Sequence, residues 1–120
     1  MFDWIRNLWP RSAKVGSRVR IWVAKPREFS ARYPRPLTGS VILIHGSTKI
    51  IVVLDTPCRY GIDIRSVVCS PRHRGDSFWR MRGKIHSNMI GLSNSAGYLP
   101  DDSSGSARNR MLLIGTIKLL

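Results

Sequence analysis

The sequence predicts a mainly β protein: a small barrel or curled antiparallel sheet of five to six strands, with a short N-terminal helix. Three observations support this fold class. Runs of valine, isoleucine and leucine recur between residues 19 and 69, either alternating or continuous. Segments rich in glycine and proline separate these runs, as turns separate strands. The chain has 120 residues, of which 42% are hydrophobic, so it allows one domain with a small core.

Residues 2–9 predict the short helix, because Phe2, Ile5 and Leu8 recur at helical spacing and form one apolar stripe. Pro10 ends it. A helix of two turns is not stable alone, so this one must dock on another surface. We favour the protein's own barrel as that surface. The tryptophans and arginines of the segment also suit a partner protein or a membrane surface.

The first strand is expected at residues 18–23, where apolar residues alternate with arginine and tryptophan. Residues 25–36 predict a loop stiffened by three prolines. Residues 37–44 and 49–54 predict two strands joined by a tight turn. Their almost continuous apolar composition indicates burial on both faces, or a cover formed by the N-terminal helix. Residues 55–57, Asp-Thr-Pro, are expected to end the second of these strands.

Residues 62–69 predict a further strand with a β-bulge near Ser66, and residues 78–86 predict a fifth. Serine, glycine and asparagine dominate the next stretch, which is typical of a flexible segment. We therefore divide the chain into four parts: residues 1–13, an amphipathic helix and basic link; 14–90, the barrel domain; 91–109, a flexible Ser/Gly-rich segment; and 110–120, an apolar C-terminal strand or tail.

The chain is strongly basic. Lysine and arginine number 20 against 7 aspartate and glutamate residues, which gives a formal net charge of +13. Self-repulsion at this charge favours association with a polyanion, most commonly nucleic acid. Arginine dominates, with 15 residues against 5 lysines, and its guanidinium group both forks onto phosphate and stacks on bases. The alternative interpretation is that a GC-rich genome raised the arginine content without any ligand.

Basic residues and aromatics are most densely mixed in Ser70–His86. This pattern suits single-stranded or looped nucleic acid, which binds through phosphate contacts and stacking. In the competing interpretation Phe78 and Trp79 belong to the core and the arginines only face water. The predicted nucleic-acid site consists of Arg18, Arg20, Arg32, Arg35, Arg72, Arg74, Arg80 and Arg82 for phosphates, and Trp22, Tyr33 and Trp79 for stacking.

No catalytic residue, metal or cofactor is predicted. The soft ligands Cys58, Cys69, His73 and His86 lack the close pairs of zinc sites. Neither a nucleophile elbow nor a phosphate-binding glycine loop occurs. Two cysteines are too few for a disulfide scaffold, and the apolar runs are too short for a membrane span. Without a secretory signal, the chain is predicted to be cytoplasmic.

Residues 16–57 resemble the opening of small SH3-like barrels, including Tudor-type and KOW-type modules. The residues that carry this resemblance are GSRVRIWV, a Pro-rich loop, LTGSVILI, a tight turn and KIIVVLDTP. The resemblance implies a strand, a long loop and an apolar hairpin that together build half of a barrel.

The same stretch is also similar to toxin endoribonucleases of the MazF type, which open with G-x-x-V and carry Arg-Pro before the second strand. In this chain, Arg35-Pro36 lies at the corresponding position, directly before the predicted strand at residues 37–44. The similarity implies that Arg35 stabilises a pentavalent phosphate. Neither Thr38 nor Thr48 aligns with the hydroxyl residue of that family.

The leading hypothesis is a non-catalytic nucleic-acid-binding module for RNA or single strands, since no helix-turn-helix is visible. Two alternatives remain. One is an endoribonuclease of the MazF type. The other is a protein-interaction or assembly subunit that associates with a partner, or with itself, through residues 1–10 or 110–120.

Overall fold

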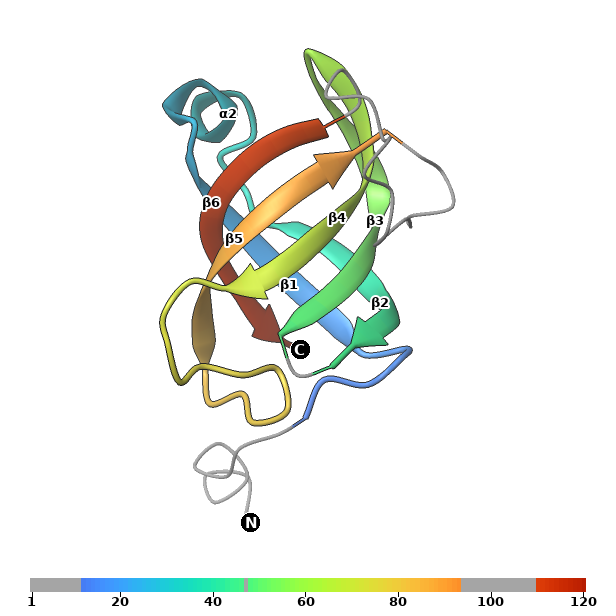
Figure 1. Ribbon diagram of the computed structural model, residues 1–120. Helices are drawn as coiled ribbons and strands as arrows, with labels where there is room; N and C mark the ends of the chain where they lie inside the picture. Colours follow the sequence, from blue (N-terminus) through green and yellow to red (C-terminus); the bar gives the residue numbers. More distant parts are fainter. Residues whose placement is uncertain (1–11, 47, 94–109) are drawn as a thin grey trace, which may run out of the picture.

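Six antiparallel strands, each paired with the next along the chain, close into a barrel when the last strand pairs with the first (Figure 1). The computed structural model describes residues 12–46, 48–93 and 110–120. The predicted fold class is confirmed: the protein is mainly β, a small closed antiparallel barrel with one short helix. The helix expected at residues 2–9 lies outside the described residues.

The elements along the chain are β1 (Arg18–Lys25), α2 (Arg27–Arg32), β2 (Leu37–His45), β3 (Lys49–Tyr60), β4 (Ile62–Pro71), β5 (Lys84–Leu92) and β6 (Arg110–Leu119). Of the two alternatives for residues 110–120, the strand is the one observed. Since β6 pairs with β1 on one side and β5 on the other, neither of its edges is free for another chain.

Helix α2 corrects the prediction of a loop at residues 25–36. Its six residues are too few to be stable by themselves. Phe29 holds the helix on the barrel, because its side chain is fully buried. Its ring centroid lies 5.1 Å from that of Tyr33 and 5.6 Å from that of Tyr60. Tertiary packing of this one residue overrides the proline-rich composition of the segment.

Strand β3 continues through residues 55–57, where the sequence predicted an end. A register shift between Val53 and Cys58 accommodates the extra residues as a bulge, which is a place where a strand tolerates proline. The bulge predicted near Ser66 is therefore on the neighbouring strand, because Val53 is the residue that pairs with Ser66. Three residues of this part of β3, Thr56, Pro57 and Cys58, also line one side of a hollow.

The fifth strand begins at Lys84 and not at Phe78, and residues 72–83 form a loop at one end of the barrel (Figure 1). The loop closes that end of the core, since Phe78 and Met81 are buried. Trp79, in contrast, is 55% exposed. The strand predicted from Phe78 onward is therefore wrong for residues 78–83. The buried residues Phe78 and Met81 are three positions apart and do not follow the two-residue period of a strand.

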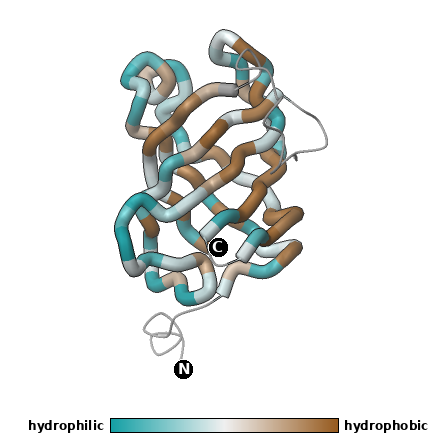
Figure 2. Tube along the Cα trace, viewed as in Figure 1, coloured by the Kyte–Doolittle hydropathy of each residue, from teal (hydrophilic) through white to brown (hydrophobic). Residues whose placement is uncertain are grey.

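Inward-facing side chains from every strand fill the barrel, with Ile21, Val52 and Ile117 among the fully buried ones. The strands approach closely at Gly115, where a Cβ atom would overlap the backbone of Trp22. Hydrophobic residues are concentrated along the strands, while the loop of residues 72–83 is mostly hydrophilic (Figure 2). The described part of the chain has no helix that is long and apolar enough to cross a membrane.

Candidate nucleic-acid interface

Three basic side chains form one row on the outside of the barrel. Arg20 of β1 lies opposite Lys118 of β6, and Lys118 lies opposite Lys84 of β5. All three are exposed. Like charges placed directly opposite each other destabilise an antiparallel pair. The ion pairs found among the described residues do not include any of them. This cation row is therefore a concentration of positive charge without an acidic partner in the part of the chain that the structure describes.

The next row across the same strands contains Trp22, Thr116 and His86. The ammonium nitrogen of Lys84 lies 4.2 Å from the centroid of the Trp22 ring, which is the geometry of a cation–π contact. Trp22 is half-buried. A base that stacked on this face of the Trp22 ring would have to displace Lys84.

The loop of residues 72–83 extends this surface. The backbone N–H of Arg72 donates to the carbonyl of His86 over 2.8 Å, and the ring centroids of His73 and His86 are 5.1 Å apart. Arg72 and His73 therefore adjoin β5, and the rest of the loop, with its other arginines and the exposed Trp79, lies at the end of the barrel where β5 begins (Figure 1). We call the combined surface the basic strand face. Its members are Arg20, Trp22, Lys84, His86 and Lys118 on the strands, and Arg72, His73, Arg74, Trp79, Arg80 and Arg82 in the loop.

Arg18, although it is predicted to bind phosphate, has its charge compensated. Its guanidinium group forms a two-pronged ion pair with Asp55, with one N–O distance of 2.7 Å, and it also donates to Ser40. Thr38 donates to the same carboxylate over 2.8 Å. Hydrogen bonds from Arg18 and Thr38 lower the pKa of Asp55 to about 2. The cluster ties β1, β2 and β3 together on the outside of the barrel.

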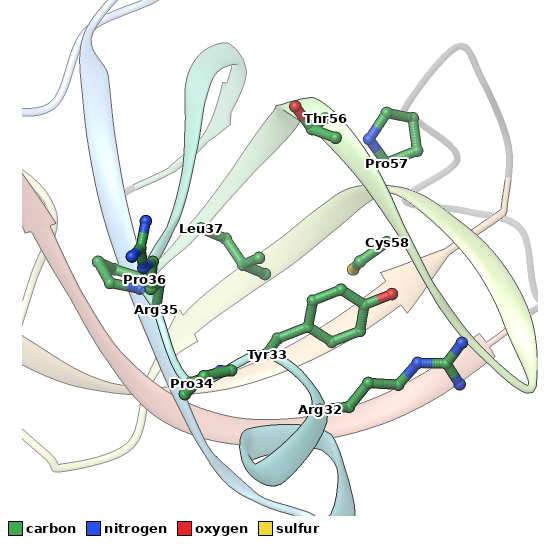
Figure 3. A pocket seen from close by; sticks show the side chains of 9 residues that line it. All are labelled: Arg32, Tyr33, Pro34, Arg35, Pro36, Leu37, Thr56, Pro57 and Cys58. Atoms are coloured by element: carbon green, nitrogen blue, oxygen red, sulfur yellow. The ribbon is translucent and has the colours of Figure 1, made fainter.

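Arg32, Tyr33 and Arg35 lie away from the basic strand face. They belong to the end of α2 and the link into β2, and α2 is at the end of the barrel opposite the loop of residues 72–83 (Figure 1). All three line an open hollow of about 540 Å³ between that link and the β3 bulge (Figure 3). The hollow is lined by Arg32, Tyr33, Pro34, Arg35, Pro36, Leu37, Thr56, Pro57 and Cys58.

Tyr33 is a structural wall of this hollow. Its hydroxyl group donates to the carbonyl of Arg59 over 3.2 Å and accepts from the N–H of the same residue over 2.8 Å. Its ring packs on Phe29. Cys58 is 3% exposed, and burial raises the pKa of its thiol to about 11. Among the described residues, the lining of the hollow includes no histidine or carboxylate.

The structure thus places seven of the eleven predicted site residues on the basic strand face. These seven are Arg20, Trp22, Arg72, Arg74, Trp79, Arg80 and Arg82. Arg18 lies on the same face of β1 as Arg20 but is paired with Asp55, and Arg32, Tyr33 and Arg35 lie at the hollow.

The predicted site does not include Lys118, because the apolar segment of residues 110–120 is compatible with either a strand or a tail. Lys84 is likewise absent from the predicted site. An isolated lysine within an alternating apolar strand is the signal that marks Lys118 as an outward-facing residue.

Fold and surface together define a small closed antiparallel β-barrel with a basic outer face. Its described residues contain no group of three or more histidine, cysteine, aspartate or glutamate side chains placed to hold a metal ion. A comparison of the chain with protein-family models, with curated proteins and with solved structures found no match.

Proposed function

We propose that the protein is a non-catalytic nucleic-acid-binding module, built on a barrel of the SH3-like kind, that holds RNA or another single strand on the basic strand face. The observation that carries this proposal is the cation row of Arg20, Lys118 and Lys84, which has no acidic partner within the described part of the chain. Phosphate oxygens would supply the missing counter-charge, and their binding would release counterions.

Preference for a single strand follows from Trp79. More than half of this side chain is exposed, with arginines on both sides of it in the loop. An indole ring can stack on an unpaired base but has no access to a base inside a duplex. The described helix, α2, has six residues and lies away from the basic strand face, so it supplies no recognition helix for a major groove.

The test is fluorescence anisotropy with a labelled single-stranded RNA, the same sequence as single-stranded DNA, and a DNA duplex, each over a series of salt concentrations. We expect log K to fall linearly with log salt, with single strands bound more tightly than the duplex. Trp79→Ala should weaken single-strand binding about tenfold, because stacking on one base contributes about 1–3 kcal/mol. Equal binding of the duplex, or no effect of Trp79→Ala, would contradict the proposed mode.

The control variant is Arg27→Gln, on α2. It removes one exposed charge away from the basic strand face, so it should change affinity much less than Arg80→Gln or Arg82→Gln. A gel of the same RNA after incubation separates binding from cleavage. Intact RNA fits the proposed module, whereas fragments that disappear in Arg35→Ala would indicate an endoribonuclease instead.

A further inference from the structure

The hollow beside β3 has rigid walls. Three of its nine lining residues are prolines, whose ring fixes the backbone. Tyr33 is held at both ends, by Phe29 at its ring and by the backbone of Arg59 at its hydroxyl group. A preformed shape of about 540 Å³ lies within the range of small-molecule sites. The hollow can therefore bind a ligand without a loss of conformational entropy in its walls.

The lining of the hollow combines an apolar surface with two cationic side chains. Leu37, the prolines and the neutral thiol of Cys58 form apolar surface around the Tyr33 ring (Figure 3). Arg32 and Arg35 reach out on two sides of that ring (Figure 3). No acidic residue lines the hollow, and neither arginine takes part in an ion pair among the described residues. Both guanidinium groups thus lack an acidic partner there, and the guanidinium carbon of Arg32 lies 5.9 Å from the centroid of the Tyr33 ring.

We propose that this hollow binds a small amphipathic anion, one that joins an aromatic ring to a carboxylate or phosphate group. The ring would pack on Leu37 and the prolines, because Arg32 and Phe29 already contact the Tyr33 ring. The anionic group would bind Arg35 or Arg32 in a forked, charge-assisted contact. The inference does not depend on the proposed nucleic-acid function, because none of the residues in the hollow belongs to the basic strand face.

The probe is phenyl phosphate, titrated into isotope-labelled protein and followed by amide chemical shifts. We expect the shifts to concentrate at Tyr33, Arg35, Leu37, Thr56 and Cys58. Benzyl alcohol carries the ring without the charge, and inorganic phosphate carries the charge without the ring. Each of these should bind about tenfold more weakly than phenyl phosphate, since each keeps only one part of the recognition.

The double variant Arg32→Gln/Arg35→Gln should weaken phenyl phosphate about tenfold or more. Arg27→Gln is the matched control, because it removes a charge from the same helix without touching the hollow. Thr56→Trp, at an exposed position, should block the mouth of the hollow with the fold intact. The inference is overturned if inorganic phosphate binds these residues as tightly as phenyl phosphate. Shifts confined to the basic strand face would overturn it as well.

The two proposals fail separately. Anisotropy with RNA reports on the basic strand face, and the double variant in the hollow should leave that signal unchanged. If RNA binding is absent while phenyl phosphate still shifts the residues of the hollow, the small-anion site stands without the nucleic-acid function.

Discussion

Replacing Lys118 with glutamate would reverse the charge at the centre of the cation row. The side chain lies between Arg20 and Lys84 and directly opposite both. Cross-strand pairs contribute about 0.2–1 kcal/mol each, with like charges unfavourable and opposite charges favourable. Because two pairs change sign, we expect Lys118→Glu to raise the free energy of unfolding by about 1 kcal/mol. In a chain of this length, that corresponds to about 3–5 °C in Tm.

The same substitution should impair the proposed function. An acidic group in the middle of the row would repel phosphates, so we expect RNA affinity to fall about tenfold or more and the salt slope to decrease by about 1–2. Thermal unfolding and anisotropy on the same sample measure both effects. The matched control is Lys49→Glu, at an exposed position on β3, which changes the net charge equally but leaves the row intact.

Opposite changes in stability and affinity are the decisive result. If Lys118→Glu and Lys49→Glu weaken RNA binding equally, overall charge and not the row determines affinity. If Lys118→Glu lowers Tm at low salt, the three cations do not repel one another and the reasoning from register is refuted. The gain in Tm should also shrink as salt is added, because screening weakens the repulsion that the substitution removes.

Three further predictions concern the barrel itself. The ion pair between Asp55 and Arg18 should stabilise the protein above about pH 4, and this contribution should be lost as pH falls toward the folded-state pKa of about 2. Comparing Tm of the native protein and Asp55→Asn across that range checks it: their difference should vanish in acid. Gly115→Ala should cost about 3 kcal/mol or more in denaturant unfolding, since its Cβ overlaps a neighbouring backbone. Burial raises the pKa of Cys58 to about 11 and that of Cys69 to about 12, so iodoacetamide at about pH 8 should modify neither until the protein unfolds, as followed by intact mass.

The strands that carry one regular pattern could be predicted from sequence. Alternation in residues 18–23 and continuous apolar runs in residues 37–44 and 49–54 located β1, β2 and the first half of β3. Both patterns are local: alternation marks a strand with one face on the core, and a continuous apolar run marks a strand buried on both faces. The helix α2 could not be found this way, because a single buried residue, Phe29, holds it through contacts distant in sequence.

The site was predictable only in part, for a similar reason. Composition identified arginines that lie in the loop of residues 72–83, but it could not separate Arg18 from Arg20. These two residues share one face of β1, and only the bulge and register of β3 bring Asp55 next to the first of them. Likewise, Lys118 joins Arg20 only through the pairing that closes the barrel, and long-range pairing leaves no trace in local sequence.

The residue types of the cation row argue against codon composition as its origin. A GC-rich genome raises arginine content, whereas lysine codons are poor in G and C. Yet two of the three cations in the row are lysines, in a chain with 5 lysines and 15 arginines.

The two aspartates that form ion pairs with arginines among the described residues lie outside the strands of the cation row. Asp55 pairs with Arg18, and Asp63 lies 3.8 Å from Arg59, and both acids are on strands β3 and β4. Strands β1, β2, β5 and β6 contain no acidic residue, whereas Asp76 lies in the loop of residues 72–83. The three strands that carry the cation row therefore supply no acid to compensate it. Lysines brought together by register, on strands without acids, are expected where a surface binds an anion from outside the protein.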